Sequence, residues 1–381
     1  VRESALSREI SSLNDDVATL AMSDPYKALS LLQDNVTKLQ AMTASSNNVM
    51  LSDMADELLS EYNLIHAQGG MTGVPTPWKE LNKATGGMQE EDFILMYADH
   101  KTMKSFLGIL FGVHAYKYAQ RRVLYYAAEM NRKLVSRRAA ACFCNLDYRA
   151  VKRGRLTKGQ YAMFEKTLNY LGAWEKETPR HGKIPRFYIV KDDGSSGKNG
   201  LYQLRAEIET FEPDIVIADS YYRMADDYDW KVQANLTKGL KSTAEQYKIP
   251  VIGISQRNRS KDKSSGDRGM GDIGYTLAGA QETDLGFRIV YDQELEDGSA
   301  RIHFIIAAAR EVKEKGFTIE FNPYTKNKWA GWLSEEDLED LNIKQREKKK
   351  KRKNVEEEGA VHRATAEVMG KALVNMRGSA Q

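Results

Sequence analysis

The sequence predicts an α/β protein in which a mostly parallel β-sheet is covered by helices on both faces. From about residue 73 to residue 332, short apolar runs rich in β-branched and aromatic residues alternate with longer stretches of helical spacing. Strands separated by helices form parallel sheets, whose ligands bind at the carboxyl ends of the strands. A charged turn, REVKEKG, separates the last two runs and indicates a hairpin. The predicted strands are 93–97, 123–127, 187–190, 215–218, 251–254, 287–291, 302–307 and 317–321.

Length and composition limit the class of protein. The chain has 381 residues, of which 41% are hydrophobic, so it can bury a substantial core. It contains no run of about 18 apolar residues, and its first ten residues lack the apolar segment of a secretory signal. Two cysteines, Cys142 and Cys144, cannot form a disulfide framework or a four-ligand zinc site. We therefore expect no membrane association and a reducing, cytoplasmic location.

The segments on either side of this core differ from it in pattern. Residues 1–70 have helical spacing, most clearly in Leu51 to Tyr62, and end at Gly69-Gly70. Residues 344–381 carry 11 basic and 5 acidic groups, a net charge of +6, which leaves 45 basic and 48 acidic groups, or −3, for the rest. The predicted organisation is a helical N-terminal segment (1–70), a main domain (71–335) and a charged, largely flexible tail (336–381).

The loop after the first predicted strand is a candidate phosphate site. It reads ADHKTMKSF, and Lys104 and Ser105 stand at the start of a helical stretch. A P-loop has this arrangement, in which backbone N–H groups and a lysine face phosphate and a serine hydroxyl reaches Mg²⁺. The P-loop pattern G-x-x-x-x-G-K-[ST] has lost both glycines here, so a surface lysine that caps a helix is the alternative. The candidate nucleotide-binding residues are Ala98, Lys101, Thr102, Met103, Lys104, Ser105 and Phe106.

Three other predicted strands end in polar residues. Asp219 could hold Mg²⁺, although a simple helix cap would explain it as well. Glu129 could polarise an attacking water, or be an ordinary solvated glutamate, and Gln256 could sense a γ-phosphate. Four strands that deliver useful groups to one edge of a sheet favour a nucleotide site over the separate alternatives.

These segments together resemble the DnaB-type hexameric replicative helicases, which have a RecA-like ATPase core. The resemblance covers about residues 50–335, with the motifs in the expected order. It is carried by GVPTPWKELNKATGGMQ (73–89), YYAAEM (125–130), DIVIADSYYRM (214–224), IPVIGISQRNRS (249–260) and LAGAQETDLGFRIVY (277–291). The resemblance implies a RecA-like P-loop NTPase that uses ATP and Mg²⁺. In it Ser105 and Asp219 hold the metal, Glu129 is catalytic and Gln256 senses the γ-phosphate.

The sequence departs from the family pattern in several places. Ala98 and Met103 replace the P-loop glycines, and a Cβ at residue 103 restricts backbone that must approach phosphate. The family's late hairpin carries Lys-x-Arg, which reaches the neighbouring subunit's site. Here Arg310 keeps the arginine-finger place, Ala308 replaces the lysine, and Lys101 offers a compensating charge. We expect the family's globular N-terminal domain to be absent or reduced to the opening helices.

Two loops occupy the positions at which the family contacts single-stranded DNA inside its ring. The first is SYYRMADDYDW (220–230), and the second, RNRSKDKSSGDRGMGD (257–272), is basic and rich in Gly and Ser. A plain surface loop is the alternative for the second. The candidate DNA-binding residues are Tyr222, Arg223, Arg257, Arg259, Lys261, Lys263 and Arg268. The basic tail could add non-specific affinity, dock an acidic partner or improve solubility.

The leading hypothesis is an ATP-dependent, ring-forming helicase or translocase, a homo-hexamer that acts on single-stranded DNA in replication with a primase or helicase loader as partner. Its helix 51–62 would pack on an adjacent subunit, although packing within the subunit explains the apolar stripe equally well. The first alternative is a RecA-like recombination mediator or helicase loader that binds ATP and DNA with weak hydrolysis, which the lost glycines and Ala308 favour. The second is a regulatory RecA-fold ATPase with no DNA role. The divergence suggests a phage-encoded protein, which would work in the cytoplasm of a bacterial host.

Overall fold

The structure is a computed structural model. It describes residues 2–24, 27–28, 31–32, 35, 50–99, 102–177, 184–192, 200–225, 230–256, 282–309 and 312–341. The chain divides into two compact units, residues 1–69 and residues 70–381.

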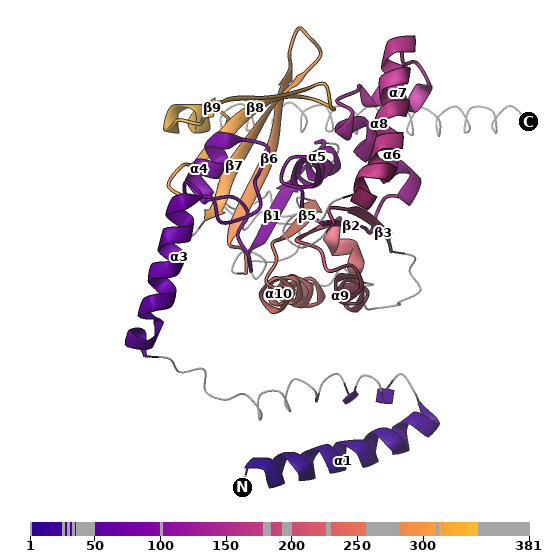
Figure 1. Ribbon diagram of the computed structural model, residues 1–381, viewed down its shortest axis with the longest axis vertical. Coiled ribbons are helices and arrows are strands. Elements are labelled where there is room, and N and C mark those ends of the chain that lie inside the picture. The colour runs from indigo at the N-terminus through magenta and orange to yellow at the C-terminus, as the bar shows by residue number, and fades with distance from the viewer. Residues whose placement is uncertain are drawn as a thin grey trace, which may run out of the picture. The chain divides into compact units, whose positions relative to one another are not determined.

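The second unit is built on one large sheet (Figure 1). Within the described residues it has nine strands in the order β3-β2-β4-β5-β1-β6-β7-β8-β9. Strands β3 to β6 in this order pair in parallel, and β6 to β9 pair as antiparallel neighbours. The strands are β1 (Phe93–Ala98), β2 (Val123–Ala127), β3 (Phe187–Lys191), β4 (Ile215–Asp219), β5 (Val251–Gln256), β6 (Leu285–Glu294), β7 (Ala300–Ala309), β8 (Gly316–Asn322) and β9 (Lys326–Trp332).

The eight predicted strands are therefore confirmed, including the hairpin of β7 and β8. The prediction missed β9, whose sequence is KNKWAGW. Its lysines alternate with other residues at the exposed edge of the sheet, and none of its side chains is fully buried. The strand consequently lacks the apolar run by which the other eight were recognised.

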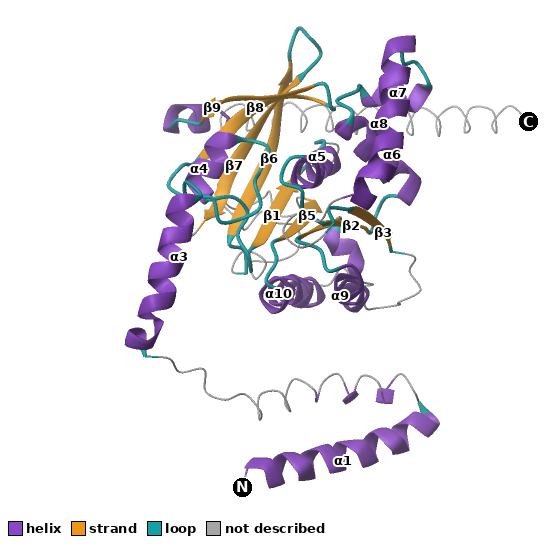
Figure 2. Cartoon of the chain, viewed as in Figure 1, coloured by secondary structure: helices purple, strands orange, loops and turns teal. Residues whose placement is uncertain are grey.

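Helices cover both faces of the sheet (Figure 2). Ile94 and Met96 of β1 pack with α5 in one core, while Phe93, Leu95 and Tyr97 pack with α9 and α10 in the other. This alternation follows from the opposite directions of successive side chains in a strand. The helices of this unit are α4 (Lys79–Thr85), α5 (Lys104–Lys117), α6 (Arg132–Phe143), α7 (Tyr148–Arg153), α8 (Lys158–Glu177), α9 (Gly200–Phe211), α10 (Trp230–Tyr247) and the 3₁₀ helix η2 (Tyr221–Met224).

Helix α5 lies very close to the sheet because two of its residues are glycines. A Cβ at Gly108 would lie 2.4 Å from Cδ1 of Ile254 in β5, and one at Gly112 would lie 2.9 Å from Cδ1 of Ile217 in β4. These distances are shorter than side chains tolerate without displacement. Helix α5, whose first turn contains Lys104 and Ser105, is thereby held against β4 and β5.

The first unit contains α1 (Arg2–Ser23), the 3₁₀ helix η1 (Leu51–Met54) and α3 (Ala55–Ala67). Helix α3 confirms the predicted helix near residues 51–62 and ends just before Gly69 and Gly70, which both have positive φ angles. None of its residues is buried. Among the helices of the described ranges, none is both long enough and apolar enough to span a membrane.

The predicted tail lies mostly outside the described residues, since the structure describes nothing beyond residue 341. Residues 335–341 are helical, and Leu341 is buried.

Candidate nucleotide site

The candidate site is formed where four adjacent strands end. In the sheet order, β2, β4, β5 and β1 are consecutive neighbours. Their registers pair Ala127 with Asp219, Asp219 with Ile254, and Ala98 with Gln256, so these strands end at one edge. The prediction that the four strand ends meet is confirmed, because parallel strands present their carboxyl ends on the same side.

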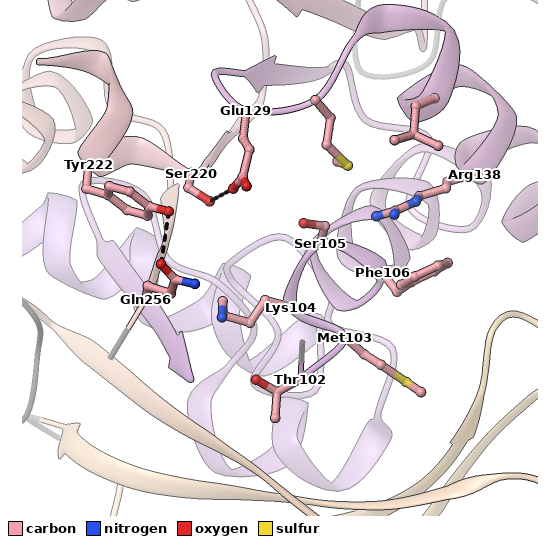
Figure 3. Close-up of a pocket in the computed structure, with 12 residues that line it drawn as sticks. Thr102, Met103, Lys104, Ser105, Phe106, Glu129, Arg138, Ser220, Tyr222 and Gln256 are labelled. Carbon is pink, nitrogen blue, oxygen red and sulfur yellow. Dashed lines mark hydrogen bonds between the residues drawn. The ribbon is translucent and has the colours of Figure 1, made fainter. Parts of the chain in front are cut away.

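A cavity of about 390 Å³ opens at this edge (Figure 3). It is lined by side chains from the loop after β1 and from α5, α6, η2 and the ends of β2 and β5. These residues are Thr102, Met103, Lys104, Ser105, Phe106, Glu129, Met130, Leu134, Arg138, Ser220, Tyr222 and Gln256. Eight of these residues were singled out in the sequence, and Figure 3 shows the side chains of Lys104, Ser105, Glu129 and Gln256 converging on the cavity.

Lys104 is partly buried, and its side chain is held by the backbone of its own loop. Its Nζ donates hydrogen bonds to the carbonyl oxygens of Ala98 at 3.0 Å and Asp99 at 2.8 Å. Burial lowers the pKa of Lys104 to about 8, although the carboxylates of Asp219, Asp99 and Glu129 act in the opposite direction. The partly buried ammonium group is thus placed where a phosphate could replace the two carbonyls, which favours a phosphate site over an ordinary surface lysine.

Nucleotide affinity is expected to fall as the pH rises above about 8. The lowered pKa of Lys104, about 8, means that the free protein loses this charge above that value, whereas bound phosphate favours the charged form. The Kd of ADP should then rise by up to about tenfold per pH unit. Equilibrium titrations between pH 7 and 9.5 measure it. Lys104→Arg keeps its charge throughout this range, so it should show a flat profile, and a flat wild-type profile would contradict the role of Lys104.

Met103 takes the backbone conformation that glycine adopts most easily. It is the N-cap of α5 and has φ 60° and ψ 14°, in the left-handed region. This is the position of the second glycine in the P-loop pattern. Its side chain packs against the core, and Figure 3 shows it directed away from Glu129. The chain therefore keeps a left-handed turn before Lys104 at a conformational cost of about 1–2 kcal/mol.

Residue 103 offers a direct test of this turn. Met103→Gly should preserve or strengthen nucleotide binding, because glycine removes the left-handed strain. Met103→Val should weaken binding by about fivefold or more, since β-branched residues tolerate positive φ worst. The Kd of a fluorescent ATP analogue measures both effects. Met163→Val, on the exposed surface of α8, is the matched control. Equal affinities for the Gly and Val variants would argue against a constrained turn.

Asp219 is the last residue of β4 and is almost fully buried. Its carboxylate accepts hydrogen bonds from the hydroxyls of Tyr125, Ser105 and Ser220. Burial raises the pKa of Asp219, and these hydrogen bonds act in the opposite direction. The N-cap of the following 3₁₀ helix is Ser220, without a side-chain capping bond, so the helix-cap interpretation of Asp219 is wrong.

The residues at this point suit Mg²⁺. The ion prefers oxygen ligands and usually takes only one or two from the protein, together with substrate phosphates and water. The Ser105 hydroxyl and the Asp219 carboxylate already contact each other and would supply such oxygens. Within the described ranges, no group of three or more His, Cys, Asp or Glu side chains forms a site that could hold a metal by itself.

The 3₁₀ helix η2 and its N-cap, Ser220, contact Glu129 and Gln256, the polar residues at the ends of β2 and β5. The Ser220 hydroxyl lies 3.2 Å from Oε2 of Glu129, and the Tyr222 hydroxyl donates to Oε1 of Gln256 at 3.3 Å. Tyr222 is only 5% exposed. This burial argues against stacking of a nucleic-acid base on Tyr222, whereas the side chain of Arg223 is 45% exposed.

Arg138 is a cavity residue that the sequence analysis did not identify. It lies on α6, with its guanidinium carbon 4.0 Å from the centroid of the Phe106 ring and 5.6 Å from that of Tyr148. Its buried Nε has no hydrogen-bond partner among the described residues. The segment NRKLVSRR contains four basic residues, and no pattern distinguishes the one that enters the cavity.

Of the predicted loop residues, Ala98 does not line the cavity. It ends β1, and its carbonyl oxygen accepts a hydrogen bond from Lys104. The residues that lie outside the described ranges are Lys101, Arg257, Arg259, Lys261, Lys263, Arg268 and Arg310.

Comparison with known proteins gives consistent similarities. Residues 73–327 match a family described as DnaB-like helicase C terminal domain. The replicative DNA helicase DnaB of Synechocystis is 21% identical over 281 residues, which cover 71% of this chain and 30% of that protein. DnaB of Haemophilus influenzae is 22% identical over 318 residues, 78% of this chain and 65% of that protein. The chain thus spans from under one third to about two thirds of the length of these relatives.

Solved structures show the same fold at low sequence identity. One of them, an ATPase domain, aligns with a TM-score of 0.59 and 18% identity, over 73% of this chain and 98% of that domain. A DnaB-like replicative helicase, described together with its interactions with primase, aligns with a TM-score of 0.57 and 15% identity, over 86% of this chain and 77% of that one. The sheet described above is therefore shared with these proteins.

Proposed function

Because this protein belongs to the family of DnaB-like helicase C-terminal domains, which matches more than half of its chain, we propose that it is an ATP-dependent, ring-forming helicase or translocase. It acts on single-stranded DNA in replication, in the cytoplasm. The observation that carries the proposal is the convergence of Lys104, Ser105, Asp219, Glu129 and Gln256 at the ends of four adjacent strands.

The arrangement supports hydrolysis of a nucleoside triphosphate. Lys104 and the amides of its loop would hold the phosphates, and Ser105 and Asp219 would hold Mg²⁺, which neutralises charge on the β- and γ-phosphates. Glu129 would orient the attacking water and accept its proton as the water oxygen bonds to the γ-phosphorus and the bond to ADP breaks. Gln256 would contact the γ-phosphate, and Arg138 offers a second cation at the same cavity.

The position of the β7 end supports assembly into a ring. Ala309, the residue before Arg310, pairs with Leu285, and Leu285 pairs with Ile94 of β1. Ile94 is four residues, about 13 Å, from Ala98 at the edge with the cavity. Arg310 therefore follows a strand, β7, that ends near the start of β1, whereas the cavity of the same subunit lies beyond the carboxyl end of β1. The β7 end thus lies away from its own subunit's cavity, and we propose that Arg310, the next residue in the chain, serves the cavity of a neighbouring subunit.

Helix α3 is a suitable link between subunits. Leu58, Leu59 and Tyr62 are 44%, 62% and 64% exposed, and they share one side of the helix. An apolar cavity of about 430 Å³, lined by residues of α5, α6, α8 and β3, lies on the main domain. We propose that α3 of one subunit packs on the main domain of the next.

Leu58→Asp is expected to weaken the assembly by about ten- to a hundredfold, because it removes the burial of one leucine from the interface. Mass photometry across a concentration series with ATP and Mg²⁺ measures the population of each oligomer. Leu64→Asp, a residue 58% exposed on another side of α3, is the matched control and should leave the distribution unchanged. Unchanged assembly in both variants would remove α3 from the interface.

The ATPase assay with and without single-stranded DNA, combined with a mass measurement in ATP, tests the proposed function. A helicase should hydrolyse ATP, respond to DNA and form a hexamer. The loss of the P-loop glycines and of a lysine at residue 308 favours one other candidate, a RecA-like mediator or helicase loader with weak hydrolysis. That candidate predicts DNA binding without stimulated turnover. A helicase would in addition be expected to work with a primase or loader.

A further inference from the structure

Arg223 pairs with the candidate catalytic base. Its Nη2 lies 3.7 Å from Oε1 of Glu129, and the Ser220 hydroxyl lies 3.2 Å from Oε2 of the same carboxylate. Both partners come from the start of the segment that follows β4. Figure 3 shows the Glu129 carboxylate turned toward Ser220. Both carboxylate oxygens of Glu129, which could accept a proton from water, therefore have a partner from η2 or its N-cap.

This pair remains open to competition. The side chains of Glu129 and Arg223 are 41% and 45% exposed, so water and other anions can reach them. An exposed ion pair of this kind is weak, and a phosphate group binds a guanidinium at least as well as a carboxylate does. The structure thus holds the glutamate by an interaction that another anion can displace.

Arg223 also lies in the segment 220–230, one of the two loops expected to face nucleic acid in the proposed function. Its neighbour Tyr222 donates to Gln256 at 3.3 Å, and the Tyr222 carbonyl accepts from Gln233 of α10 at 3.0 Å. The 3₁₀ helix η2 therefore contacts Glu129, Gln256 and α10 together. A ligand that pulls Arg223 away acts directly on the groups that complete the cavity.

We propose that Arg223 is a positioning residue that couples single-stranded DNA to hydrolysis. Without DNA, Arg223 and Ser220 hold Glu129 toward η2. A DNA phosphate takes over the guanidinium, and the carboxylate is released to orient water above the γ-phosphate. The proposal rests on the proposed function and deepens it by assigning how the site responds to its substrate.

The first test measures ATP hydrolysis without DNA. Arg223→Gln should raise this rate by about two- to fivefold, the size expected for loss of an exposed ion pair, and should reduce the stimulation by oligo(dT) correspondingly. Arg223→Lys keeps a cation and should restore the low DNA-free rate in part. Lys238→Gln removes the same charge from an exposed position on α10 and should resemble wild type. A merely structural role would lower the rate in Arg223→Gln, and an unchanged or lower DNA-free rate overturns the proposal.

The second test does not depend on hydrolysis. If DNA and Glu129 compete for Arg223, then by reciprocity Glu129→Gln should tighten oligo(dT) binding about two- to fivefold. The gain should vanish when Arg223→Gln is already present. Fluorescence anisotropy at low salt gives the four affinities of this double-mutant cycle. A gain that persists without Arg223, or no gain at all, overturns the proposal. If wild type binds oligo(dT) but shows no ATPase, the hydrolytic function fails while this cycle still decides the role of Arg223.

Discussion

Replacing Lys104 with alanine is expected to lower DNA-stimulated ATP hydrolysis by about 10²–10³-fold, the effect of losing one pre-placed group that stabilises transition-state charge. In the structure, the ammonium group of Lys104 is already inside the loop, bound to the carbonyls of Ala98 and Asp99. Little reorganisation is required for it to meet phosphate. Steady-state phosphate release with and without oligo(dT) measures the loss, and thermal unfolding checks that the variant is folded.

Two further measurements would show that the loss of activity is specific to Lys104. Lys152→Ala, on an exposed part of α7, removes a lysine remote from the cavity and should keep the wild-type rate. Nucleotide affinity should fall in Lys104→Ala together with the rate, since the same charge serves both. Wild-type turnover in Lys104→Ala would sink the assignment of this loop as the phosphate site.

Replacing Arg310 with alanine is expected to lower the rate by about 10³–10⁵-fold, as for other arginine fingers. ATP binding and ring formation should persist, because the arginine would act from a neighbouring subunit and only on the transition state. A fluorescent ATP analogue, mass photometry and the ATPase assay separate the three properties.

Mixing subunits gives the decisive control. In a ring of Lys104→Ala and Arg310→Ala subunits, some interfaces combine an intact Lys104 with an intact Arg310 from the neighbour. Action in trans thus predicts that mixing two inactive variants restores part of the activity. If Arg310 served its own subunit, no interface of the mixture would be complete. Activity that stays absent after mixing, in rings shown to contain both variants, would contradict the trans role.

The strands and the meeting of their ends could be predicted because both depend on local sequence and on the geometry of parallel sheets. Runs such as IVIAD and VIGISQ are apolar, β-branched and closed by a polar residue. Their shared edge follows once the strands are parallel. The exposed edge strand KNKWAGW has no such run and was missed.

The side-chain contacts of the site could not be predicted because they depend on packing between distant segments. The contact of Arg138 with Phe106 joins two helices, and the contact of Arg223 with Glu129 joins residues that are 94 positions apart. The conformation of Met103 is a different case. The pattern requires glycine there, and only the backbone angles show that methionine adopts the left-handed turn.

The separation of the cavity and the β7 end, at opposite ends of the strands, has a consequence for the symmetry of the proposed assembly. If the cavity of one subunit accepts what the β7 end of the next supplies, and the contact does not repeat in reverse, the interface is heterologous and subunits add in a single direction. A dimer with a two-fold axis would complete both cavities only if the same two surfaces met twice, once in each direction. Whether the row of subunits closes into a ring or continues as a helical filament then depends on the rotation between neighbouring subunits. A small change in that angle, without any change in the catalytic groups, would convert one assembly into the other.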